Sequence, residues 1–189
     1  MQTRERTLEI KGIKASYFTS TGTCLSKSGE LIVAAAALLG EYGHLNEDPA
    51  SLSFGGCAIS NAGQDLLIAG KEIDESKSWE LCILNGISPA ADHLRSAAAT
   101  LHFSGDALVN CVLSLEKACE VTGCLEMASA ASDDFLAAGS YLKKAGEGMR
   151  AYGVELRKGS KVEDLAGLHL IEAGELLSKS GFQLSDMFG

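Results

Sequence analysis

The chain has 189 residues, which suits a single domain of ordinary size. Hydrophobic residues make up 46% of it and charged residues 22%, proportions that exclude a disordered chain. Only 2 residues are proline, which favours helices, although 21 glycines are unusual for a helical protein and need an explanation.

The net charge of −9 is unevenly distributed along the chain. The first 28 residues carry a net charge of +3, so the rest of the chain carries −12. An acidic body argues against nucleic-acid binding, which requires clustered basic side chains. The basic N-terminal arm is a candidate contact with an acidic partner through Arg4, Arg6, Lys11 and Lys14.

A period of seven residues organises nearly the whole chain. A small residue, at a position termed a, is followed three residues later by a large apolar residue, at a position termed d. Sixteen of the eighteen a positions are Gly, Ala or Ser. The eighteen are Gly22, Gly29 and Ala36; Gly56, Gly63 and Gly70; Ala91, Ala98, Gly105, Val112 and Cys119; Ser132, Gly139, Gly146 and Gly153; and Gly167, Gly174 and Gly181. Such a repeat indicates helices that pack nearly antiparallel or parallel with a left-handed twist.

The glycines in this pattern must serve close packing. Twelve of the 21 glycines fall at a positions. At roughly 0.5–1 kcal/mol for each mid-helix glycine, they would cost on the order of 6–12 kcal/mol, which is comparable with the whole stability of a domain. We therefore expect them to create contacts between helix backbones that a methyl group would block.

Residues typical of helix starts and ends divide the chain into about five helices. The short connections between them predict a single all-α, up-and-down bundle. Asp48-Pro49 and Ser88-Pro89 read as starts of the second and third helices, and Ser160-x-x-Glu163 is a capping box that opens the fifth. The fourth helix begins near Leu125 or at Ser132. The predicted elements are an N-terminal arm over residues 1–20 and helices over 21–43, 49–76, 89–122, 125–158 and 161–182.

The heptad pattern lapses over residues 74–88, where an apolar cluster surrounds the only tryptophan, Trp79. This segment either extends the second helix or forms a short separate helix over one end of the bundle. As a docking patch it would present Trp79, Ile83 and Leu84, because tryptophan is favoured at the centres of interfaces. As a purely structural feature it would be a hydrophobic plug over the core.

No motif in the chain indicates catalysis, a cofactor or a metal site. Phosphate-loop, nucleophile-elbow and dinucleotide-binding motifs are missing from the sequence. The weak candidates are the Ser-x-x-Lys spacings at Ser114 and Ser140 and the pairs His102–Asp106 and Cys119–Cys124, each of which has a simple structural explanation. We therefore expect a protein that is not an enzyme.

The sequence favours a non-catalytic structural, linker or docking subunit whose partners are other subunits of a larger protein assembly. A peripheral subunit of an organelle membrane complex would fit. The alternative is a bundle that holds a lipid, pigment or other apolar ligand in its interior.

The expected compartment is intracellular and reducing, either cytoplasm or organelle interior. The six cysteines form no C-x-x-C pair, the N-terminus has no apolar signal region, and the longest apolar run is the ten residues from Leu31 to Gly40. That run is too short for a membrane span, so any membrane association would be peripheral.

Overall fold

The computed structural model describes residues 15–42, 49–75, 79–100 and 132–186, apart from the side chains of residues 42, 79, 80, 83, 98–100 and 132–139. These ranges are helical throughout except for the turn at 157–160, and they contain no strand. The elements are α1 (Ala15–Tyr42), α2 (Pro49–Glu75), α3 (Trp79–Cys82), η1 (Ile83–Ile87), α4 (Ser88–Thr100), α6 (Ser132–Leu156) and α7 (Lys161–Ser185). The predicted all-α bundle is confirmed.

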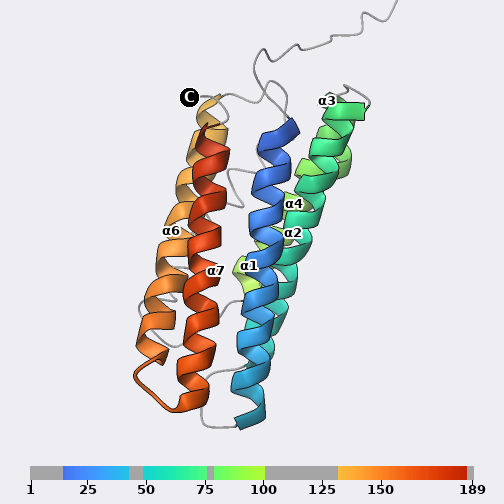
Figure 1. Ribbon diagram of the computed structural model, residues 1–189. Coiled ribbons are helices and arrows are strands. Elements are labelled where there is room, and N and C mark those ends of the chain that lie inside the picture. Colours follow the sequence, from blue (N-terminus) through green and yellow to red (C-terminus); the bar gives the residue numbers. More distant parts are fainter. Residues whose placement is uncertain (1–14, 43–48, 76–78, 101–131, 187–189) are drawn as a thin grey trace, which may run out of the picture.

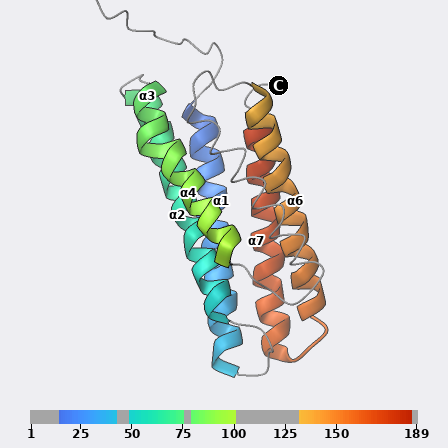
Figure 2. The same cartoon turned by 180° about the vertical axis from the view of Figure 1, so that it is seen from behind.

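Two antiparallel hairpins, α1–α2 and α6–α7, form the body of the molecule (Figure 1). They join through α1 and α7, which lie side by side and run in opposite directions. On the far side of α2, the helical segment α3–η1–α4 packs against that helix (Figure 2). Helix α1 is therefore central, with α2 on one side and α7 on the other.

The glycine seams lie within the two hairpins, as the heptad pattern predicts. Nine seam glycines have a backbone atom of the facing helix within 3.0 Å of the place where a β-carbon would sit. They are Gly22, Gly29, Gly56, Gly63 and Gly70 between α1 and α2, and Gly146, Gly153, Gly167 and Gly174 between α6 and α7. No side chain fits at these positions, because each would have to enter the backbone of its neighbour.

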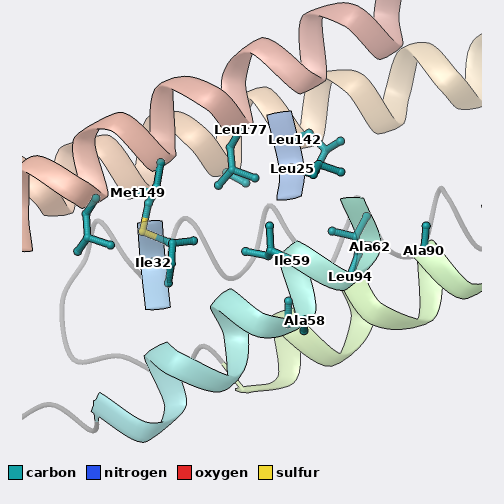
Figure 3. Close-up of a cluster of buried hydrophobic side chains, with 14 of the residues drawn as sticks. Leu25, Ile32, Ala58, Ile59, Ala62, Ala90, Leu94, Leu142, Met149 and Leu177 are labelled. Carbon is teal, nitrogen blue, oxygen red and sulfur yellow. The ribbon is translucent and has the colours of Figure 1, made fainter. Parts of the chain in front are cut away.

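The large d residues fill the space beside the seams and meet in one core. Figure 3 shows Leu25 and Ile32 of α1 among Leu142 and Met149 of α6 and Leu177 of α7, with Ile59 of α2 in the same cluster. Leu25, Ile32 and Ile59 are fully buried. Burial of such side chains contributes about 1.5–3 kcal/mol each, which offsets the conformational cost of the glycines.

A second line of small residues joins the two hairpins. Ser28 of α1 donates a buried hydrogen bond of 2.8 Å from Oγ to the carbonyl oxygen of Ala173 in α7. Seven residues earlier in α1 and seven later in α7 stand Thr21 and Ser180. Seven residues later in α1 and seven earlier in α7 stand Ala35 and Ala166. All six residues are completely buried: Thr21, Ser28 and Ala35 of α1, and Ser180, Ala173 and Ala166 of α7.

The two hairpins are also internal repeats of each other in sequence. Helix α1 matches α6 at the same spacing through Phe18, Gly22, Leu25, Lys27, Gly29 and Glu30 against Phe135, Gly139, Leu142, Lys144, Gly146 and Glu147. Helix α2 matches α7 through Leu52, Gly56, Ser60, Gly63 and Leu66 against Leu170, Gly174, Ser178, Gly181 and Leu184. The repeat accounts for the shared geometry of the two glycine seams.

The first predicted boundary is wrong. Helix α1 begins at Ala15 rather than at residue 21, so residues 15–20 do not belong to the N-terminal arm. Phe18 is fully buried in the core. It occupies a d position one heptad before Leu25, and it faces the part of α2 where Gly70 leaves room for Ala15.

The predicted start of the third helix at Ser88 and Pro89 agrees with the first residue of α4, but the chain is already helical before it. The chain is helical without a break from Trp79 to Thr100, with the wider turns of a π-helix over Ile83–Ile87. Pro89 lacks the N–H that a regular helix would use here, and its ring would crowd the carbonyl four residues earlier, so a widened turn before it accommodates the ring. Residues 79–87 therefore open the following helix instead of extending α2 or standing alone.

The remaining boundaries agree closely with the prediction where they are described. Helix α2 ends at Glu75 and α7 spans Lys161–Ser185. The capping box is present, since the Ser160 side chain accepts from the Glu163 backbone and the Glu163 side chain accepts from the Ser160 backbone. Residues 101–122 of the predicted third helix and 125–131 of the fourth lie outside the described residues.

Candidate functional site

The predicted docking patch lies on α3 and η1, at the end of the molecule where α1 begins and α7 ends (Figure 1). Cys82 and Ile87 are buried from this segment, whereas Leu84 is 65% exposed and Leu81 is 38% exposed. One side of the segment therefore packs into the molecule, and the other presents leucine to solvent. The side chains of Trp79 and Ile83 lie outside the described part of the structure, as do Arg4, Arg6, Lys11 and Lys14.

Gly86 sets how closely this segment approaches α2. A β-carbon there would come within 2.6 Å of the Ala69 α-carbon. The Asn85 side-chain amide donates to Glu72 Oε1 at 3.0 Å, one turn further along α2. Asn85 and Gly86 thus form a tight contact between this segment and α2.

Acidic residues lie in the last turns of α2, the helix against which this segment packs. Glu72, Asp74 and Glu75 fall in the last turns of α2, and that helix has no basic residue in its last turn. Lys71 makes an exposed ion pair of 3.9 Å with Glu75. These acids are evident in the sequence, just before the apolar cluster around Trp79.

His93 is held by a partner that sequence reasoning missed. Its Nδ1 lies 2.6 Å from Asp65 Oδ2, and this hydrogen-bonded pair joins α4 to α2. The residues are 28 positions apart, so no local spacing indicates the contact. The pair is a polar contact between two helices. Within the described residues, no group of three His, Cys, Asp or Glu side chains is placed to hold a metal ion.

The described cysteines differ in exposure and acidity. Burial raises the pKa of the Cys82 thiol to about 12, and the nearby Glu72 carboxylate adds to the effect. Burial also raises the pKa of Cys24, partly opposed by Lys179 and Lys27. Because the thiolate is the nucleophilic form, neither buried cysteine is suited to attack a substrate at neutral pH. Cys57 is exposed on α2.

Of the Ser-x-x-Lys spacings, the structure describes one lysine. Lys143, of the Ser140-x-x-Lys143 spacing, lies over the ring of Phe182 at 4.6 Å, a cation–π contact between α6 and α7. Ser114, His102, Asp106, Cys111, Cys119 and Cys124 lie outside the described residues.

Helix α1 is long and apolar enough to cross a membrane by length and composition alone. Core helices of water-soluble proteins satisfy the same criterion, and 56% of the apolar window is buried against the rest of the structure. Its central place between α2 and α7 gives the apolar residues of α1 a packing role.

Comparison with known proteins adds no assignment. No family model, no curated protein and no solved structure matches this chain.

Proposed function

We propose that this protein is a non-catalytic structural or docking subunit of a larger protein assembly. The observation that carries the proposal is the pair of glycine-seamed hairpins, in which the helix backbones are in contact along several turns. Helices of 25–28 residues at 1.5 Å per residue make each hairpin about 40 Å long. Close-packed hairpins of this length form a rigid frame suited to holding partners at a fixed spacing.

The exposed end formed by α3 and η1 supplies a contact surface on that frame. Leu84 is among the most exposed large apolar side chains described, and it lies two residues after buried Cys82 in the chain. It also lies within a π-helical turn, an irregularity often found at functional sites. A rigid frame that carries an exposed leucine at one end is consistent with docking.

An intracellular, reducing compartment is part of the proposal, with a peripheral place on an organelle membrane complex as one form of it. The described cysteines, Cys24, Cys57 and Cys82, are free thiols. Free thiols, one of them exposed, suit a reducing environment.

The alternative of an apolar ligand in the interior gains no support from the small residues. The nine seam glycines leave no space, because backbone atoms of the facing helix occupy the positions that side chains would fill. A cofactor or lipid would need room elsewhere. Extractable lipid or visible absorbance in the purified protein would favour that alternative.

Quantitative affinity capture from the native source tests the proposed function. The full chain should recover a discrete set of proteins in stoichiometric amounts, and Leu84→Asp should reduce that recovery without lowering the melting temperature. Phe54→Asp provides a matched control, since Phe54 is 66% exposed near the other end of α2. Failure of the full chain to recover any stoichiometric protein would refute the proposal.

A further inference from the structure

The contact between the two hairpins differs in kind from the contacts inside them. Within each hairpin, glycines bring two helix backbones together, as Gly22 and Gly63 do in the first hairpin and Gly153 and Gly167 in the second. Among the described helices, α1 against α7 is the main backbone contact that joins one hairpin to the other. Serine, threonine and alanine side chains line this contact. The hairpins are therefore built more tightly than the joint between them.

Completely buried hydroxyl groups gather at the α1–α7 contact. Of the serines and threonines that the structure describes, three are completely buried, and all three lie here: Thr21, Ser28 and Ser180. Ser28 donates across the contact to the Ala173 carbonyl oxygen at 2.8 Å, whereas Ser180 donates to the Leu177 carbonyl oxygen of its own helix. The Thr21 hydroxyl has no hydrogen-bond partner in the described structure. Closing this contact therefore removes polar groups from water without full compensation.

From this difference we infer that the protein opens along the α1–α7 contact, with each hairpin moving as a rigid unit. Proteins open locally in cooperative units, and the weakest contacts separate first. Water hydrates the Thr21 hydroxyl in the open state, while the glycine seams inside the hairpins stay closed. Because Leu25 of α1 and Leu177 of α7 are also buried in the shared core, the open state is a minor population. The inference does not depend on the proposed docking function.

Cys24 of α1 is a native probe of this opening. Its side chain is 6% exposed, so the closed contact protects the thiol from alkylation. Burial raises the pKa of this thiol and Lys179 of α7 partly opposes the rise, which places the thiol near that helix. Cys57 is exposed on α2 and reports the labelling rate of a thiol that needs no opening. The ratio of the two rates therefore measures how often the thiol of Cys24 becomes accessible.

The experiment follows alkylation of the full chain without denaturant, and mass spectrometry of peptide fragments resolves each cysteine. Thr21→Val should slow labelling of Cys24 relative to Cys57 by about 2- to 30-fold, because valine removes the polar group whose burial weakens the closed contact. Gly153→Ala is the seam control, since its β-carbon would lie 2.6 Å from the Gly167 carbonyl oxygen and should lower the urea midpoint. This variant should leave Cys24 labelling unchanged, because the α6–α7 seam is closed in both the open and the closed state.

Each contrary outcome overturns the inference. If Gly153→Ala accelerates Cys24 labelling in proportion to its loss of stability, the thiol reacts only from the unfolded chain. If Thr21→Val leaves the labelling rate unchanged, the opening does not occur at this contact. Should Gly153→Ala fail to fold, Ser160→Ala takes its place, because loss of the α7 N-cap also destabilises the second hairpin without touching the contact between the hairpins.

Gly70→Ala separates this opening from fraying of the start of α1. Its β-carbon would lie 3.0 Å from the carbonyl oxygen of Ala15, so the variant weakens the hold of α2 on the first turns of α1. Opening along the α1–α7 contact should proceed at the same rate in this variant. Faster labelling of Cys24 in Gly70→Ala would show that α1 frays by itself, and the inference would fail.

Discussion

Gly22 and Gly63 face each other across the α1–α2 interface with no room for a side chain on either one. A β-carbon at Gly22 would lie 2.6 Å from the Gly63 carbonyl oxygen, and one at Gly63 would lie 2.5 Å from the Gly22 carbonyl oxygen. The same reciprocal contact recurs at Gly153 and Gly167 in the other hairpin. Each glycine thus serves the closeness of two backbones.

Gly63→Ala should destabilise the protein by about 1–3 kcal/mol even though alanine is the better helix former by about 1 kcal/mol. The added methyl group would meet backbone atoms of Gly22 and Ser26, which cannot rotate away. Urea denaturation measures the change. Gly40→Ala is the matched control on α1, because its β-carbon would meet only the Pro49 β-carbon at 3.7 Å. The control should be neutral or stabilising, and equal losses for both variants would contradict the seam.

Thr21→Val should stabilise the protein by about 0.5–2 kcal/mol. The Thr21 hydroxyl is completely buried between α1 and α7 and has no hydrogen-bond partner in the described structure, so its desolvation is uncompensated. Valine keeps the branched shape and removes the polar atom. Thr23→Val is the control, since Thr23 is exposed and its hydroxyl donates to Thr19. A lower melting temperature for Thr21→Val would show that the hydroxyl is satisfied.

Cys82 should make the protein lose stability as the pH rises above about 9. The folded thiol keeps its proton up to a pKa of about 12, whereas the unfolded thiol loses its proton near its ordinary value of 9.0. Unfolding therefore releases a proton between these values, and stability falls there by up to about 1.4 kcal/mol per pH unit. Below the unfolded pKa the thiol is protonated in both states and contributes no pH dependence.

The test compares urea denaturation of the wild type and Cys82→Ala from neutral to alkaline pH. The wild type should lose stability more steeply than the variant above pH 9, because lysine and tyrosine titrations are common to both proteins. Parallel curves would show that Cys82 ionises freely in the folded state.

Alkylation followed by mass spectrometry should also label exposed Cys57 well before buried Cys24 and Cys82.

Ser160→Ala should cost about 1 kcal/mol, the usual value of a helix N-cap. The Ser160 hydroxyl accepts from the Glu163 backbone N–H at 3.3 Å, which satisfies one of the free donors at the start of α7. Ser160→Asp should retain most of the stability, because its carboxylate accepts the same bond and suits the positive end of the helix. Thermal unfolding in the two variants separates loss of the cap from a general effect of substitution at this turn.

The heptad spacing of small and large residues was sufficient to predict the helices and the role of the glycines. Gly22 and Gly29 in one helix, and Gly56 and Gly63 in the next, are seven residues apart, and only one face of a helix has that period. The costs of mid-helix glycine required a compensating contact, and the structure places that contact between backbones. The internal repeat of the two hairpins is equally present in the sequence.

Two predictions of helix boundaries from local sequence differ from the structure because tertiary packing extends the helices. Ser88-Pro89 resembles a helix start, yet the chain is helical on both sides of it, since a π-turn accommodates the proline and Gly86 lets the segment lie against Ala69. Residues 15–20, predicted to belong to the N-terminal arm, form the start of α1, because burial of Phe18 stabilises the helix there.

The sequence alone determined which residues face other helices, because the spacing of apolar residues and the geometry of the backbone are properties of each helix by itself. Which helix each face meets was decided only in three dimensions, because five similar stripes of small residues leave many pairings open. The hydrogen bond between His93 and Asp65, the bond from Ser28 to Ala173 and the exposure of Leu84 all depend on that choice of partners. They arise from contacts between segments far apart in sequence, for which no spacing along the chain provides a signal.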